Sequence, residues 1–140
     1  MVESSLNPMA FRHEPAFWQN YMKDKPEWKD RDPQEVSSSY GLMQIMYTTA
    51  WGLGFRGAGI ELYNPVYNIE LGAKLLRQLY DGLKPKSSYK CWPWEAVLAR
   101  YNGGSSGNPG PDGGLRNYQY TRKVLQAYWS IREKEVDCDK

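Results

Sequence analysis

A helical repeat of apolar residues between Asn64 and Leu83 constrains the fold of this chain more than any other feature. Apolar or small side chains recur there at intervals of three and four residues: Ile69, Gly72, Ala73, Leu76, Leu79, Tyr80 and Leu83. That spacing predicts an α-helix that begins at Asn64-Pro65 or Asn68, ends near Leu83 and buries this stripe. The chain has 140 residues, which is enough for one domain with a core.

Similar patterns predict further helices on both sides of this one. One helix is expected at about Pro15–Lys23, one from Pro93 onward and one at Leu115–Arg132. A further short helix is expected to begin at a cap formed by Thr48 or Thr49 and to end at Gly52 and Gly54. The helices that begin at Pro93 and Leu115 are expected to face inward through Trp94, Val97, Leu98 and Tyr101, and through Tyr118, Val124, Leu125, Tyr128 and Ile131. Loops are expected at 24–38 and 102–114. The chain is therefore predicted to be mainly α, with one domain over 1–132 and a charged tail over 133–140.

Composition and charge exclude several classes of function. The net charge is +2, and the 18 basic and 16 acidic residues are mixed along the chain, so no dense basic patch is present to bind nucleic acid. Residues 36–55 carry no charge, but polar residues interrupt them too often for a membrane span. The eleven Tyr and six Trp suit either an aromatic core or a half-wet sugar-binding surface.

Metal and redox chemistry find little support in the sequence. His13 is the single histidine, and Cys91 and Cys138 lie far apart without a CxxC pattern, so no metal site is expected. The two cysteines are compatible with one disulfide or with two thiols. Met1 leads directly into Val2-Glu3-Ser4, without a basic start or an apolar stretch, so no signal peptide is expected in this chain.

Four short strings occur in an informative order. They are Glu3-Ser4-Ser5-Leu6-Asn7-Pro8, Gly41-Leu42-Met43-Gln44-Ile45-Met46, Ala99-Arg100-Tyr101-Asn102-Gly103-Gly104 and Tyr120-Thr121-Arg122-Lys123-Val124. In this order they resemble the signature of soluble lytic transglycosylases, to which goose-type lysozymes are similar. The run from Asn64 to Leu76 resembles the helix that this family places between its second and third motifs. The resemblance extends from residue 2 to about 129, and it implies a lysozyme-like helical domain with a central cleft.

The resemblance also implies a role for particular residues. It makes Glu3 the catalytic acid/base and Ser4 the hydroxyl beside it. The residues implied to contact the sugar or to position the glutamate are Met43 through its backbone, Gln44, Tyr101, Asn102 and Tyr120, with Tyr118 as an alternative to Tyr120. Tyrosines on helix faces are as often part of a core, and we keep both interpretations for Tyr101 and Tyr120.

Cleavage of a glycosidic bond requires a proton for the leaving oxygen and stabilisation of an oxocarbenium-like centre. We expect Glu3 to supply the proton, with its pKa raised by apolar walls that include Leu42, Met43, Tyr101 and Tyr120. No second carboxylate is evident, because Glu14, Asp30, Asp32 and Glu35 lie in no recognisable motif. The resemblance implies that none is needed: the substrate's own N-acetyl group stabilises the cation, and a 1,6-anhydro ring is formed. It implies no cofactor.

Two alternatives remain at this stage. One is hydrolysis by water, as in goose-type lysozymes, with a second carboxylate such as Asp32 or Glu35. The other is a peptidoglycan-binding module without activity. In either case the expected partner is the glycan strand of peptidoglycan. The expected setting is the periplasm or the cell exterior, or release of a phage lysin at lysis, and the protein is expected to be a monomer.

The sequence departs from the family pattern in two places. The family carries a full helix ahead of the glutamate, whereas two residues precede Glu3 here, so we expect that helix to be truncated. The stretch 13–38 resembles an insertion. Its aromatic residues Phe17, Trp18, Tyr21 and Trp28 are expected either to wall one end of the cleft or to complete the core, and we favour the core.

Overall fold

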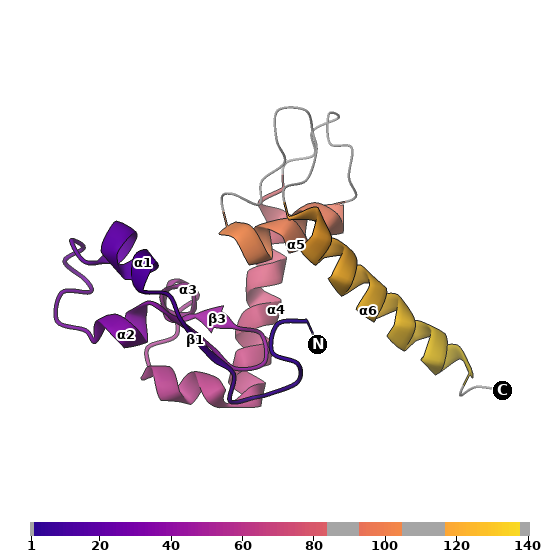
Figure 1. The fold of residues 1–140 in the computed structure, drawn as a ribbon, viewed down its shortest axis with the longest axis horizontal. Helices are drawn as coiled ribbons and strands as arrows, with labels where there is room; N and C mark the ends of the chain where they lie inside the picture. The colour runs from indigo at the N-terminus through magenta and orange to yellow at the C-terminus, as the bar shows by residue number, and fades with distance from the viewer. Residues whose placement is uncertain (1, 84–92, 105–116, 138–140) are drawn as a thin grey trace. The chain divides into compact units, whose positions relative to one another are not determined.

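The computed structural model describes residues 2–83, 93–104 and 117–137, and it is mainly helical, as predicted (Figure 1). The chain divides into two compact units, the first covering Glu3–Lys74 and the second beginning at Leu75. The two cysteines, Cys91 and Cys138, lie outside the described residues. Within the described residues, no helix combines the length and apolar character that a membrane span requires.

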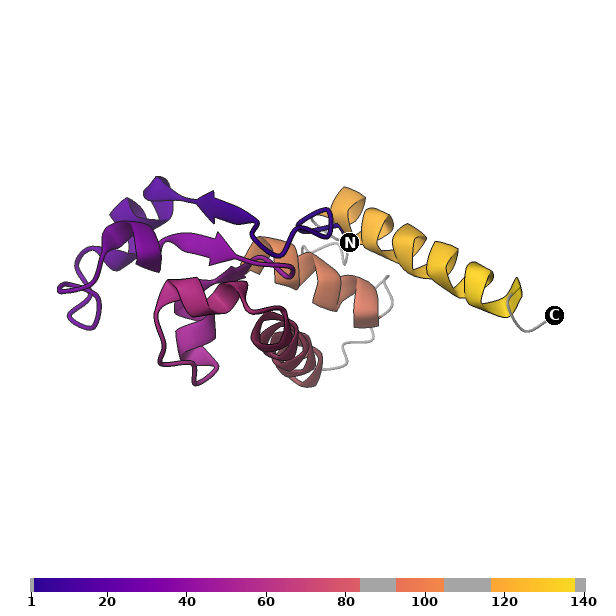
Figure 2. The same cartoon turned by 90° about the horizontal axis from the view of Figure 1, so that it is seen from below.

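The first unit contains a small antiparallel sheet that the sequence analysis did not predict. Its strands are β1 (Phe11–His13), β2 (Ser38–Tyr40) and β3 (Ile45–Met46), in the spatial order β1-β2-β3 (Figure 2). Tyr40 pairs with Phe11 on one side and with Ile45 on the other. Strands of two or three residues are too short to show alternation, and β1 and β2 are far apart in sequence. The pairing is therefore a product of the tertiary structure.

The first unit also contains three short helices, of which α3 contacts the sheet through β2 and β3. α1 (Pro15–Phe17) continues into the π-helix η1 (Trp18–Met22), so the predicted helix at 15–23 is present with a wider last turn. α2 (Pro33–Val36) lies where a loop was expected, and the Asp32 side chain caps it by accepting a hydrogen bond from the Gln34 N–H (3.0 Å). α3 (Tyr47–Gly52) begins earlier than predicted. Its N-cap residue is Met46, which makes no side-chain cap, so the predicted threonine cap is wrong.

Aromatic residues form much of the core of the first unit. Trp28, from the segment expected to be a loop, is 5% exposed and packs its ring edge-on to Tyr47 (6.2 Å between centroids) and Trp51 (5.6 Å). The core interpretation is therefore correct for Trp28. Tyr21, from the same segment, is 63% exposed, and Phe17 and Trp18 are half-buried. One aromatic residue of this insertion-like stretch thus completes the core, and the others remain at or near the surface.

The helix α4 (Pro65–Asp81) confirms the helix predicted between Asn64 and Leu83. Asn64 caps it, because its side-chain oxygen accepts a hydrogen bond from the Val66 N–H (2.9 Å). The predicted buried stripe is only partly correct, since Ile69, Ala73 and Tyr80 are exposed. Along α4 the fully buried residues are Asn68 and Gly72, because a loop from the sheet packs against them.

The second unit contains α5 (Pro93–Gly103) and α6 (Tyr118–Asp137), which pack against each other. The predicted start at Pro93 is correct, and α6 continues to Asp137, past the predicted end at Arg132. The small residues Ala96, Ala99 and Thr121 are buried with Val97. Four side chains expected to face inward are instead about half exposed: Trp94, Tyr118, Tyr128 and Ile131.

Candidate active site

Glu3 and Ser4 lie in a turn that leads into Asn7-Pro8. The Asn7 N–H donates to the Ser4 carbonyl (3.0 Å), and the next two residues, Ser5 and Leu6, have left-handed backbones with φ of 52° and 66°. Successive left-handed residues cannot continue a right-handed helix, so this segment is a turn and not the end of a helix. Ser4 is buried and Glu3 is half-buried. This places the candidate acid partly within the protein and partly in reach of solvent.

Backbone hydrogen bonds connect this turn to the second motif. The Ala10 N–H donates to the Asn7 carbonyl (3.2 Å), and the Ala10 carbonyl accepts from the Gly41 N–H (2.8 Å). The same Ala10 carbonyl also accepts from the side-chain amide of Gln44 (3.1 Å). Two of the four motifs are thus tied together within the first unit through a residue, Ala10, that belongs to neither.

The second motif forms the turn between β2 and β3. Gly41 (φ +73°) and Gln44 (φ +48°) both have left-handed backbones, and the Gln44 N–H donates to the Gly41 carbonyl (3.1 Å). The Gln44 Nε2 also donates to that carbonyl (3.0 Å), in addition to Ala10. Both hydrogens of the Gln44 amide therefore donate to backbone carbonyls of the first unit, one inside this loop and one outside it. The group this side chain can offer a sugar is its carbonyl oxygen.

Asn68, which sequence reasoning missed, holds this turn in place. It is fully buried, and its Oδ1 accepts from the Met43 N–H (2.6 Å). Its Nδ2 donates to the carbonyls of Tyr40 (2.8 Å) and Leu62 (2.9 Å). The sequence contained one signal for it: Asn68 is a polar residue four positions before Gly72, on the same face of the helix with the clearest apolar repeat. A buried amide in that position must find partners.

Met43 is a packing residue in this structure. Its side chain lies against Gly72 of α4, where an added Cβ would come within 2.7 Å of the Met43 Cε. Its backbone N–H is taken by Asn68, as described above. The role implied for the Met43 backbone is therefore to shape the loop, and the loop presents Leu42 and Gln44 as its other half-buried residues.

The remaining predicted site residues belong to the second unit. Tyr101 and Asn102 lie in the last turn of α5, and Tyr120 lies in the first turn of α6. Tyr101 and Tyr120 are half-buried, whereas Tyr118 is 53% exposed. A tyrosine that positions another side chain needs contact with its surroundings, so burial favours Tyr120 over Tyr118. The two helices meet at Thr121, which is fully buried and whose hydroxyl donates to the Glu95 carbonyl (3.5 Å).

Three of the four carboxylates considered as a second catalytic group have structural partners. Asp32 caps α2, and Glu14 pairs with Arg12 (2.6 Å). Glu35 accepts a hydrogen bond from the Gly59 N–H (2.6 Å) and lies 4.0 Å from Arg31. Burial, followed by the negative charge of Glu35, raises the pKa of Tyr40 to about 12 and also raises the pKa of Tyr47. Glu35 thus interacts with buried residues of the first unit.

No group of three or more metal-ligating side chains gathers within the described residues. His13, the single histidine, is exposed on β1.

Comparison with known protein families matches residues 1–109 to the transglycosylase SLT domain. No curated protein and no solved structure matched the chain. The family match covers well over half of the sequence. It contains the Glu3 turn, the Gly41–Met46 loop, α4, and the end of α5 with Tyr101 and Asn102, whereas Tyr120 lies beyond it. The chain therefore belongs to the transglycosylase SLT domain family.

Proposed function

We propose that this protein is a peptidoglycan lytic transglycosylase. It would cleave the β-1,4 bond between N-acetylmuramic acid and N-acetylglucosamine and leave a 1,6-anhydromuramic acid end. The observation that carries the proposal is the half-buried Glu3 beside the buried Ser4, at the position of the first motif in a chain of this family. A peptidoglycan substrate places the protein's action in the cell envelope, in the periplasm or outside the cell, or in phage-induced lysis.

In the proposed reaction Glu3 first donates its proton to the glycosidic oxygen as the bond to the muramic acid C1 breaks. The substrate's own N-acetyl oxygen stabilises the positive charge that develops at C1. The 6-hydroxyl of the same sugar then attacks C1, and Glu3, now a carboxylate, takes up the hydroxyl proton. The proton count balances, because Glu3 returns to its starting state.

The other site residues are proposed to position the sugar. The two amide hydrogens of Gln44 already donate to the carbonyls of Ala10 and Gly41. The Gln44 carbonyl oxygen is therefore the atom proposed to accept a hydrogen bond from the sugar. The loop around it is pre-shaped by Asn68, which lowers the entropic cost of binding. Tyr101 and Asn102 are proposed to line the floor near the scissile bond, and Tyr120 to hold Glu3.

Hydrolysis by a water molecule is the alternative reaction, and it calls for a second carboxylate. Asp32 and Glu35 are the carboxylates considered for it, and both accept backbone hydrogen bonds that stabilise the first unit. Their structural roles favour a mechanism with Glu3 as the single catalytic carboxyl. A binding module without activity is the other alternative, and the experiment below distinguishes all three.

The test is digestion of purified sacculi followed by mass analysis of the soluble products. The parent protein should release muropeptides that are lighter by one water than hydrolysis products. Glu3→Gln should lose at least about a hundredfold in rate, because it cannot transfer the proton. Glu27→Gln, a matched change at an exposed glutamate, should behave as the parent does.

Three outcomes would contradict the proposal. Products that carry the added water would establish hydrolysis. Equal rates for the parent and Glu3→Gln would remove Glu3 from the chemistry. A parent that releases nothing, yet binds sacculi as tightly as Glu3→Gln does, would establish a binding module.

A further inference from the structure

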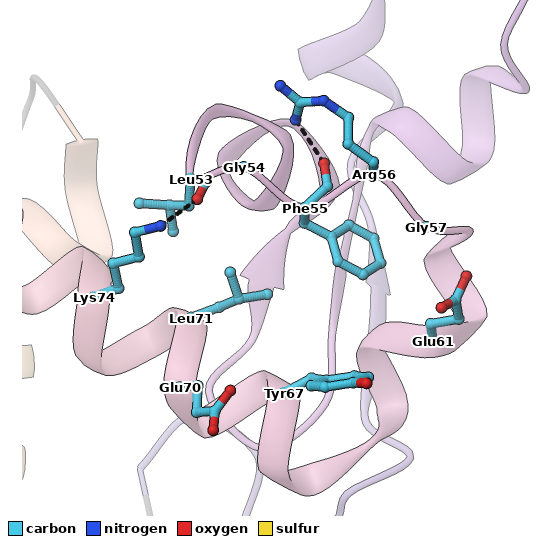
Figure 3. Close-up of a pocket in the computed structure, with 10 residues that line it drawn as sticks. All are labelled: Leu53, Gly54, Phe55, Arg56, Gly57, Glu61, Tyr67, Glu70, Leu71 and Lys74. Carbon is cyan, nitrogen blue, oxygen red and sulfur yellow. Dashed lines mark hydrogen bonds between the residues drawn. The ribbon is translucent and has the colours of Figure 1, made fainter.

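An open cavity of about 460 Å³ lies in the first unit (Figure 3), and none of the residues that line it belongs to the motifs of that unit. One wall is the face of α4 that carries Tyr67, Leu71 and Lys74, and the other is the loop 53–57 together with Glu61 of η2 (Gly59–Tyr63). Successive residues of an α-helix are about 100° apart around its axis. The cavity face of α4 is therefore distinct from the face that carries Asn68 and Gly72 and supports the second motif.

Side chains hold the backbone of the loop wall in one conformation. The Lys74 ammonium donates to the Leu53 carbonyl (2.6 Å), and the Tyr47 hydroxyl donates to the Gly57 carbonyl (3.0 Å). Arg56 donates to the carbonyls of Trp51 and Phe55 (2.7 Å each). A wall tied at this many points is ordered before a ligand arrives, so binding does not have to order it.

Two aromatic rings and a leucine supply the apolar surface of the cavity. Figure 3 shows the Phe55 and Tyr67 rings on opposite sides of it, with Leu71 alongside. The Phe55 ring is held edge-on against Tyr47 (6.3 Å between centroids, 89° between planes). Tyr67 is 51% exposed, although it lies in a concave surface. About half of this residue is therefore accessible from the cavity side or from solvent.

The polar groups of the cavity favour a neutral ligand that donates hydrogen bonds. Glu70 makes no hydrogen bond or ion pair with any residue in the described parts of the chain, so its carboxylate can accept from a ligand. Lys74 and Arg56 both donate to backbone carbonyls, and Figure 3 shows the Arg56 guanidinium pointing away from the Tyr67 ring. Glu61 is likewise engaged, since it accepts from the Ala58 N–H (2.8 Å).

We propose that this cavity is a glycan-binding subsite that takes an N-acetylhexosamine unit of the peptidoglycan strand. Such a sugar has an apolar C–H face to lie on Tyr67, an acetyl methyl group to contact Phe55 and Leu71, and hydroxyl and amide hydrogens to donate to Glu70. The choice of sugar rests on the proposed function. A subsite outside the motif residues would hold the strand while another part of it is cleaved.

The test is a titration of the whole protein with the N-acetylglucosamine trimer, followed by amide-resolved NMR. The trimer contains no muramic acid, so binding is measured independently of the proposed cleavage. We expect the amide signals of Gly54, Gly57 and Glu70 to shift. Tyr67→Ala should raise the dissociation constant read from those signals by about fivefold or more, because the stacking surface is lost. Tyr67→Phe should bind as the parent does.

Ile69→Ala is the matched control, because it removes another exposed apolar side chain from the same helix and Ile69 does not line the cavity. Circular dichroism of each variant checks that it is folded. The proposal is overturned if the trimer leaves the three cavity signals unshifted, if Tyr67→Ala binds as tightly as Ile69→Ala, or if a glycan-free stem peptide shifts these signals and the trimer does not. Sacculus digestion by the parent is scored separately, so failure of the subsite and failure of the transglycosylase proposal give different results.

Discussion

At the scale of single residues, Asn68 organises the second motif although it lies outside all four motifs. Its side chain satisfies three backbone groups from three segments: the N–H of Met43 and the carbonyls of Tyr40 and Leu62. The motif loop, β2 and η2 are thus held on α4 by one buried amide. A sequence motif marks the residues that meet the substrate, whereas the residue that supports them can lie elsewhere.

We predict that Asn68→Ala lowers the free energy of unfolding by about 3 kcal/mol or more, because three buried backbone groups lose their partner at roughly 1–3 kcal/mol each. Urea unfolding followed by circular dichroism measures the change. Asn20→Ala, at an exposed position of η1, should stay within about 0.5 kcal/mol of the parent. A loss below about 1 kcal/mol for Asn68→Ala would show that the loop does not depend on this amide.

At the scale of secondary-structure elements, the turn between β2 and β3 depends on a glycine. Gly41 has φ +73°, and a Cβ there would lie 2.5 Å from the Asn68 Nδ2 and 2.7 Å from the Leu62 carbonyl oxygen. An L-residue is disfavoured both by the left-handed backbone and by the lack of space. The turn can therefore approach α4 and η2 this closely only without a side chain at position 41.

We predict that Gly41→Ala destabilises the protein by roughly 2 kcal/mol or more, since both strain and a clash with buried backbone are introduced. Gly52→Ala is the matched control. A Cβ at Gly52 meets nothing within 4 Å, and this residue lies in α3. Alanine there should stabilise the protein by about 0.5 kcal/mol, because it restricts the unfolded chain. Thermal unfolding of both variants measures the difference, and equal midpoints would refute the argument from space.

At the scale of the whole molecule, the raised pKa of the buried Tyr40 makes the free energy of unfolding depend on pH. The pKa of Tyr40 is raised to about 12 in the folded state, mainly by burial and then by Glu35, from an ordinary value of 10.0. Between these values the unfolded chain releases a proton that the folded protein retains. The stability that this proton contributes is complete below pH 10 and is lost as the pH rises towards 12.

We therefore expect the free energy of unfolding to fall between pH 10 and 12, with a contribution from Tyr40 on the order of 2 kcal/mol. Denaturant unfolding at a series of pH values measures the slope. Tyr40→Phe should have a shallower slope over this range, whereas Tyr21→Phe, at an exposed tyrosine, should keep the slope of the parent. Identical slopes for Tyr40→Phe and the parent would contradict the prediction.

The sequence by itself determined the family, the mainly helical class, the position of α4 with Asn64 as one of two possible caps, and the start of α5 at Pro93. These features depend on local information: a helical period, a capping residue and a proline suited to a first turn. The candidate site residues were also named from the sequence, because the motifs occur in the family's order. Their roles remain predictions, and the digestion of sacculi tests them.

Only the tertiary structure decided the three-stranded sheet, the burial of Trp28 and Asn68, the turn at Glu3 and the cavity beside Tyr67. Each depends on contacts between residues far apart in sequence, such as Phe11 with Tyr40 and Met43 with Asn68. A three-residue strand or a single buried amide has no local pattern of its own, because its stability comes from partners that the fold brings together. Features that depend on interactions between residues close in sequence could therefore be predicted, whereas features that depend on contacts between residues distant in sequence could not.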